Sequence, residues 1–296
     1  MRYIKWIIFV LFIGGILYIC GRWIMESRDF PVCSASSHKV VHISFDDVVQ
    51  VLKDLKDNSA CYESIFRNTF LRNLKELHDK YGACFSLYVF EQAGDFHITD
   101  MPDKFRNEFK TNASWLKFGF HAVSPEFDRQ MSFRDFQASF ENVYRAICHF
   151  ADTASLSPVL RLHYFWGNDS VVSLLRDYGI KGLLCADDER DSYNLSKEEN
   201  KVLQQKFYLE KDLKYFKTDL RYEKMRYMDE ALERIRNRDT LVLFTHEWAY
   251  LPLTLRQEIA CMVRTYSLPP NWFAESKLEK SIKWLKNHGY EFSFLE

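Results

Sequence analysis

Short apolar runs rich in β-branched and aromatic residues alternate with helix-like stretches along most of the chain. The runs lie at residues 40–45, 83–90, 116–120, 159–165, 182–185, 241–244 and 290–295. Between them, residues 62–81, 132–151, 170–178, 222–237, 255–266 and 277–288 are expected to be helical. Strands that alternate with helices predict an α/β fold with a parallel sheet or a β/α barrel. About seven runs favour one seven-stranded, partly open barrel, with the charged stretch 187–222 as a partly helical insertion that crosses the surface.

The size and charge of the chain narrow the class further. Its 296 residues, 47% hydrophobic and 27% charged, suit one substantial core. The net charge of −1 provides no basic field, so we expect no nucleic-acid partner.

The N-terminus carries an apolar run at residues 6–20, with Arg2 and Lys5 before it and Arg22 after it. With the next few residues the run approaches the roughly 20 residues that span a bilayer. A cleaved signal peptide is the alternative, but no small-x-small cleavage pattern stands near the end of the run. We expect a signal anchor at 1–25, a linker at 26–37 and a barrel at 38–296. The charges at Arg2 and Lys5 favour an extracytoplasmic catalytic domain.

Four of the apolar runs contain or precede chemically useful side chains near their C-terminal ends. These are Asp46 and Asp47, then His121, then Arg161 and His163, and finally His246 followed by Glu247. In parallel β/α folds these strand ends gather on one rim. Carboxylates and imidazoles together suit a divalent ion such as zinc, whereas the alternative for Asp46 and Asp47 is a loop pair that caps the next helix. Alternation along a strand at 159–165 would place Arg161 and His163 on one face.

The ordered set of motifs resembles the NodB-type polysaccharide deacetylases of carbohydrate esterase family four. Ser44-Phe45-Asp46-Asp47 is similar to the family's Thr-Phe-Asp-Asp-Gly, and Phe118-Gly119-Phe120-His121 to the approach to its second motif. Leu160-Arg161-Leu162-His163-Tyr164 stands where the family has Arg-Pro-Pro-Tyr, and Leu243-Phe244-Thr245-His246-Glu247 resembles the last motif. The resemblance runs from about residue 40 to 296. It implies a partly open barrel that removes acetyl groups from a glycan, with Asp46 as base, Asp47 and His121 as metal ligands, Arg161 orienting Asp46, and His246 as acid.

One departure from the family concerns the metal. The family's second motif has another His four residues after the first, and this position is Pro125. We hypothesise that His163 takes over as the third ligand. The alternative is a barrel-lining His163 that hydrogen-bonds an acidic group.

The resulting hypothesis is a metal-dependent carbohydrate deacetylase, a hydrolase of amide or ester bonds that uses a metal-activated water. Tyr164, Trp166 and Trp248 are candidate substrate-binding aromatics, with core packing as the alternative. Glu247 would either hold His246 in one tautomer or lie at the surface. The competing function is a catalytically degraded barrel that binds glycan without hydrolysing it.

Overall fold

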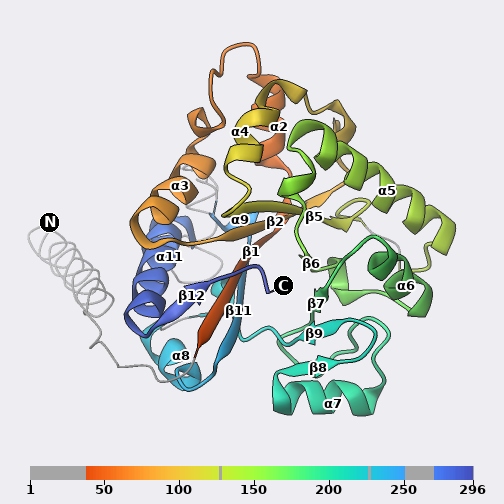
Figure 1. Cartoon of the computed structure of the whole chain (residues 1–296), viewed down its shortest axis with the longest axis vertical. Coiled ribbons are helices and arrows are strands. Elements are labelled where there is room, and N and C mark those ends of the chain that lie inside the picture. Colours follow the sequence, from red (N-terminus) through yellow and green to blue (C-terminus); the bar gives the residue numbers. More distant parts are fainter. Residues whose placement is uncertain (1–37, 127–128, 226–227, 251–269, 296) are drawn as a thin grey trace, which may run out of the picture.

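A parallel sheet of six strands forms the centre of the computed structural model (Figure 1), which describes residues 38–126, 129–225, 228–250 and 270–295. Strand β1 (Lys39–Val48) lies between β11 (Thr240–His246) and β2 (Phe85–Phe90), and β5 (Leu116–Ala122) pairs with β2. Strand β10 (Leu220–Arg221) extends the sheet beyond β11, and β12 (Tyr290–Phe292) pairs with the start of β1. The sheet therefore brings the C-terminal ends of β1, β5 and β11 to one edge.

A second sheet has four strands. Its order is β6 (Val159–Leu160), β7 (Gly182–Leu184), β9 (Lys214–Phe216) and β8 (Tyr208–Glu210), with β8 antiparallel to β9. One isolated parallel bridge, Phe118 to Leu156, joins the neighbourhoods of β5 and β6. At the other side the chain runs directly from β9 into β10. The strands thus follow the predicted β/α arrangement, incompletely joined between β5 and β6.

Helices cover the outer faces of the sheets (Figure 1). The α-helices are α2 (Gln50–Asp57), α3 (Thr69–Tyr81), α4 (Arg106–Thr111), α5 (Phe133–Phe150), α6 (Asp169–Asp177), α7 (Lys197–Lys206), α8 (Met228–Ile235), α9 (Glu247–Tyr250) and α11 (Pro270–Asn287). Short 3₁₀ turns lie at Ile65–Arg67, Ile98–Asp100, Asp103–Phe105, Thr153–Ser155, His163–Phe165 and Tyr222–Lys224, and a small hairpin pairs β3 (Gln92–Ala93) with β4 (Phe96–His97). Asn68, Ser132, Asn168 and Ser196 each accept a backbone hydrogen bond at a helix N-terminus, as N-cap residues do.

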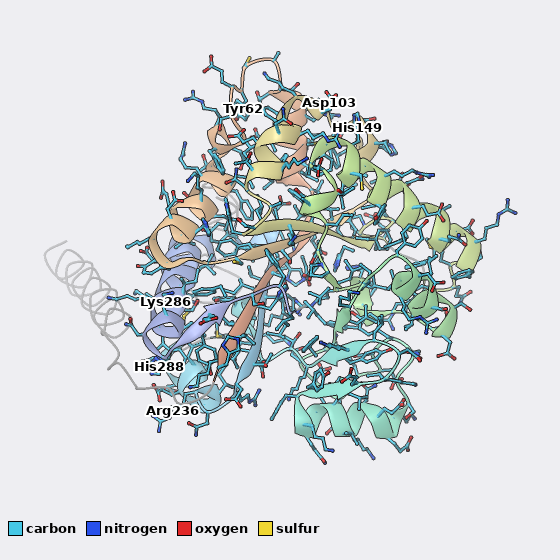
Figure 2. All side chains as sticks on the ribbon, in the orientation of Figure 1. Tyr62, Asp103, His149, Arg236, Lys286 and His288 are labelled. Carbon is cyan, nitrogen blue, oxygen red and sulfur yellow. The ribbon has the colours of Figure 1, made fainter. Side chains whose placement is uncertain are left out.

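The core lies between the sheets and the helices, where side chains fill the space (Figure 2). The amphipathic pattern of α5 shows how the sequence builds it. Phe136, Phe140, Val143, Ile147 and Phe150 repeat every three or four residues, and all five are buried. Burying this stripe holds α5 against β5, beside His121.

Two predictions need correction. The stretch 187–222 is partly helical, as predicted, because it contains α7, but it also contains β8, β9 and β10, so it completes both sheets instead of forming a surface insertion. The run 159–165 is a strand only at Val159–Leu160, because the chain turns at His163–Phe165 with Tyr164 in the left-handed region (φ 55°). Strand alternation therefore does not orient Arg161 and His163.

Several predictions fall on residues outside the described ranges. These are the anchor at 1–25, the linker at 26–37 and the helix at 255–266. Across the described residues, no helix combines the length and apolar character needed to cross a bilayer.

Candidate metal centre and catalytic site

The two carboxylates at the end of β1 stand on a β-bulge. Phe45 pairs with Leu87 and Val48 with Val89, so Asp46 and Asp47 together oppose one residue of β2. In a regular strand, adjacent side chains point to opposite faces. Asp47 instead adopts left-handed backbone (φ 56°), and a bulge of this kind redirects a side chain next to an active site. Asp47 can therefore face His121 while Asp46 faces Arg161.

His121 is also placed by a shift in strand register. Phe120 pairs with Val89 and Ala122 with Phe90, which leaves His121 as the extra residue of β5. Its Nδ1 lies 2.6 Å from the carbonyl oxygen of Arg161, so Nδ1 carries the proton that this carbonyl accepts. The neutral ring then presents the lone pair of Nε2, the form in which histidine binds a metal.

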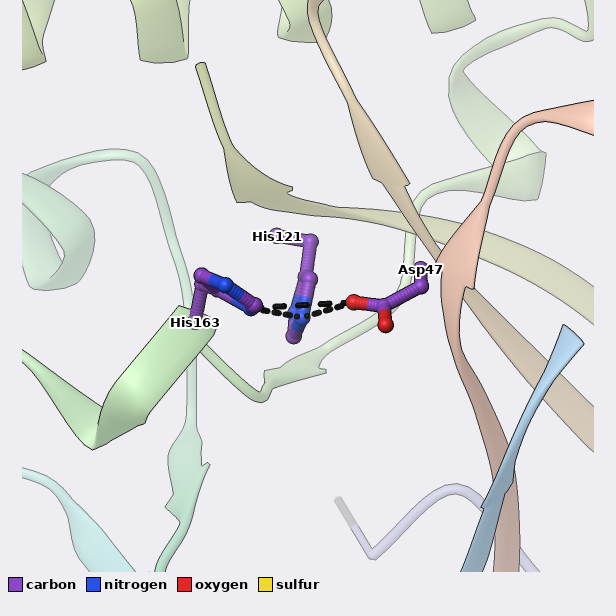
Figure 3. Close-up of side chains that lie close together, drawn as sticks. All are labelled: Asp47, His121 and His163. Carbon is purple, nitrogen blue, oxygen red and sulfur yellow. Dashed lines mark hydrogen bonds and ion pairs between the residues drawn. The ribbon is translucent and has the colours of Figure 1, made fainter. Parts of the chain in front are cut away.

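Asp47, His121 and His163 form a triangle of potential ligand atoms (Figure 3). The separations are 3.0 Å between His163 Nδ1 and His121 Nε2, 3.2 Å between His121 Nε2 and Asp47 Oδ1, and 3.6 Å between His163 Nδ1 and Asp47 Oδ1. Ligands about 2.1 Å from a tetrahedral zinc ion would lie about 3.4 Å apart. The triangle thus fits one face of a tetrahedral site, and the open side would leave room for water or substrate.

Burial and charge support the same donor set. Oδ1 of Asp47 is buried and has no hydrogen-bond donor among the described residues. Burial alone would raise the pKa of Asp47, but the adjacent imidazole of His121, with the charges of His246 and His163, lowers it to about 2. Burial lowers the pKa of His163 to about 4, and His121 adds to this effect. At neutral pH the site therefore offers a carboxylate and a neutral imidazole, both able to coordinate a cation.

Asp46 lies beside the triangle and contacts a buried arginine. Arg161 Nη1 is 3.5 Å from Asp46 Oδ2, while Nη2 donates to Thr218 Oγ1 over 3.1 Å. Thr218 in turn donates to the Cys185 carbonyl over 2.6 Å, and the guanidinium lies 3.9 Å above the ring of Phe244. The guanidinium of Arg161 is thus held by Asp46, Thr218 and Phe244. The other oxygen of Asp46, Oδ1, is buried without a hydrogen-bond partner in the described structure.

His246 stands opposite Asp46 and is held by a residue that sequence reasoning missed. Asp46 and His246 are register partners on β1 and β11. Glu223 Oε1 accepts from His246 Nδ1 over 2.9 Å and from the His246 backbone amide over 2.6 Å. Nε2 then faces Asp47 Oδ2 at 3.8 Å. Burial favours neutral His246, but the carboxylates of Glu223, Asp46 and Asp47 outweigh it and raise the pKa of His246.

Glu247 has neither of its two predicted positions. It is buried, so it is not a surface residue, and its carboxylate accepts backbone hydrogen bonds at the start of α2. It holds no tautomer of His246, because Glu223 occupies that position. Glu223 belongs to the short turn after β10, at the start of the helix predicted at 222–237, which begins only at Met228.

The three predicted substrate-binding aromatics separate into two groups. Tyr164 and Trp248 are exposed, at 47% and 52%, and their rings lie 4.1 Å from His163 and 5.1 Å from His246. Trp166 is partly buried against Phe136, with 5.6 Å between ring centroids. The exposed rim of the site therefore has two aromatic platforms, one on each side of the triangle. Pro125, which replaces the second-motif histidine, is exposed.

No protein-family model matches the chain, and no curated protein matches it either. Several solved structures are similar to the chain. A family 4 acetyl xylan esterase from Clostridium thermocellum, in complex with a cobalt ion, has 14% identity and a TM-score of 0.44, with 86% of this chain and 87% of that one covered. The catalytic domain of a peptidoglycan N-acetylglucosamine deacetylase from Eubacterium rectale has 12% identity and a TM-score of 0.40, with coverages of 90% and 92%.

A CE4 family pseudoenzyme from Bacillus anthracis is similar at 10% identity and a TM-score of 0.44. The match covers 87% of this chain, which spans 64% of the length of that protein. These are proteins of the kind that the sequence motifs resemble.

Proposed function

We propose that this chain is a metal-dependent hydrolase that removes acetyl groups from a polysaccharide or other glycan. The observation that carries the proposal is the triangle of Asp47, His121 and His163, with Asp46 and His246 beside it on neighbouring strands. A structural cluster has no need of a base, a cation site and an acid together. Zinc is the proposed metal, because two imidazoles and one carboxylate suit it.

The residues divide the work of hydrolysis. Asp47, His121 and His163 would hold the divalent ion, which when bound polarises a carbonyl and lowers the pKa of water. Asp46, whose carboxylate contacts the Arg161 guanidinium, accepts the proton of the attacking water. His246, whose pKa is raised by the paired Glu223 carboxylate, donates a proton to the departing sugar amine or alcohol. Tyr164 and Trp248 offer ring faces on which a sugar can stack.

Acetate release tests this proposal. The full-length protein is stripped with a chelator, reloaded with Zn²⁺, and supplied with N-acetylated and O-acetylated glycans, including peptidoglycan, chitin oligosaccharides and acetylated xylan. We expect acetate from at least one of them with the reloaded protein and none with the stripped one. A zinc-loaded protein that binds a glycan and releases no acetate would establish the competing function, a binding barrel without hydrolysis.

We also propose that residues 1–25 anchor the protein in a membrane with the barrel on the extracytoplasmic side. The apolar run 6–20 and its flanking Arg2 and Lys5 support this. Membrane fractionation, followed by protease treatment of intact cells, tests it. Protein found in the soluble fraction, or protected in intact cells and digested only after lysis, contradicts it.

A further inference from the structure

The short segment that follows β11 contacts the β1–α2 turn through two consecutive side chains. Residues 247 and 248 follow directly on the last pair of β11 with β1, His246 with Asp46, so they lie close to the end of β1. His246 is already assigned to acid catalysis. The side chains of Glu247 and Trp248 reach the turn that presents Asp47. Glu247 has no part in the proposed hydrolysis, and Trp248 has been given only a ring face for sugar stacking.

Glu247 supplies the cap that the first turn of α2 lacks locally. The N-cap position is Val49, whose side chain cannot accept a hydrogen bond. Glu247 Oε2 accepts from the amides of Val49 and Gln50, and Oε1 from that of Val51, each over 2.8 Å. Three amides that would otherwise lack partners are thus satisfied by one buried carboxylate, at the start of α9 and far from α2 in the sequence. The first of them stands two residues after Asp47.

Trp248 contacts the ligand carboxylate itself. Its Nε1–H donates to Asp47 Oδ2 over 3.1 Å, which leaves Oδ1 facing His121 and His163. Its ring stacks on His246 with 5.1 Å between centroids and 23° between planes. A left-handed aspartate is intrinsically strained, so its conformation depends on surrounding contacts.

We propose that Glu247 and Trp248 are positioning residues for Asp47. Glu247 holds the backbone just after the bulge, and Trp248 fixes which carboxylate oxygen faces the two imidazoles. The inference rests on the proposed metal function of Asp47 and adds to it the means by which the ligand is oriented. It also gives Trp248 a role besides any stacking on sugar.

Co²⁺ titration of the full-length protein, followed by the visible absorption of the bound ion, tests the proposal. Residues that orient a ligand contribute 10–100-fold to metal affinity in other sites, so Glu247→Gln and Trp248→Phe should each weaken Co²⁺ binding roughly tenfold. Trp248→Phe keeps an aromatic ring against His246 and removes only the donor. It is an exposed position, so this variant provides the test even if Glu247→Gln does not fold.

Asp54→Asn is the matched control. Asp54 is also on α2 and accepts from Asn58, Tyr62 and Asn68, at 2.9, 3.1 and 2.7 Å, but it lies beyond the first turn. We expect its Co²⁺ affinity to stay within about twofold of wild type. In metal-free protein, hydrogen exchange at the Val49–Val51 amides should quicken in Glu247→Gln and not in Asp54→Asn.

Three results would overturn the inference. If Glu247→Gln and Trp248→Phe both bind Co²⁺ with wild-type affinity, the inference is wrong. It is also wrong if Asp54→Asn loses as much Co²⁺ affinity as they do, since that would indicate general loosening of α2. A Trp248→Phe variant with weaker glycan binding and unchanged Co²⁺ binding would return Trp248 to sugar stacking alone. Failure of the wild type to bind Co²⁺ is a different result, because it refutes the proposed metal function itself.

Discussion

Nδ1 of His163 lies 3.0 Å from Nε2 of His121, although the two residues are 42 positions apart in the sequence. We predict that His163→Ala loses most of its bound zinc, because two ligands remain of three. His149→Ala is the control, since His149 is exposed on α5 (Figure 2). Elemental analysis of the purified proteins measures the outcome. Full zinc occupancy in His163→Ala would show that His163 is not a ligand.

Asp46→Asn should remove the base and leave the metal in place. General-base catalysis typically contributes 10²–10⁴-fold, so we expect kcat for acetate release to fall by about that factor. Asp57→Asn, at an exposed position of α2, should keep wild-type activity. Zinc content, measured on the same samples, should be unchanged in both. Activity in Asp46→Asn within a few-fold of wild type would contradict the assignment.

Glu223→Gln should shift the pH profile of the enzyme. Glu223 helps to raise the pKa of His246, and an acid catalyst works only below its own pKa. Loss of the carboxylate lowers that pKa, so the alkaline limb of the kcat profile should move to lower pH. Glu210→Gln, on exposed β8, should leave the profile unchanged. An alkaline limb that stays in place in Glu223→Gln means that His246 does not set it.

His42 should make the fold sensitive to acid. It is fully buried on β1, near Tyr88 and the Ser293 carbonyl, and burial followed by the charge of Arg161 lowers its pKa to about 3. The unfolded chain then takes up the proton first, near pH 6.5. The free energy of unfolding therefore has its full value above pH 6.5 and decreases as the pH falls towards 3, by roughly 3 kcal/mol between pH 6.5 and 4.

Urea unfolding of metal-free protein at several pH values measures this effect. His42→Gln should be less stable than wild type at pH 7 and should show a flatter dependence between pH 6.5 and 4. Identical slopes in the two proteins would mean that other groups cause the acid sensitivity.

The strand-end pattern predicted much of the site because a parallel sheet collects C-terminal ends. The structure brings Asp46, Asp47, His121, Arg161, His163 and His246 to that edge, and their roles stay proposals. The prediction that alternation along a strand places Arg161 and His163 on one face was wrong. A left-handed turn at Tyr164, invisible to an alternating pattern, replaces the expected strand.

Most features that could not be predicted from the sequence depend on contacts between residues far apart in the chain. Glu223 and Glu247 are two of many glutamates, and only the folded chain shows that the first binds His246 and the second caps α2. The strands β9 and β10 are short and lie in a charged stretch, so their pairing partners supply the signal that local composition lacks. The bulges at Asp46–Asp47 and His121 likewise depend on register with β2.

The source of the third ligand has a mechanical consequence. Asp47 and His121 belong to the six-stranded sheet, whereas His163 follows β6 of the other sheet, across an edge joined by one bridge. An ion held by all three residues would act as a cross-link between the two sheets, much as a disulfide joins distant segments of a chain. Resistance to unfolding would then rise with free metal concentration, by RT ln(1 + [metal]/Kd). A ligand at position 125, just after the strand β5 that carries His121, would not join the two sheets in this way.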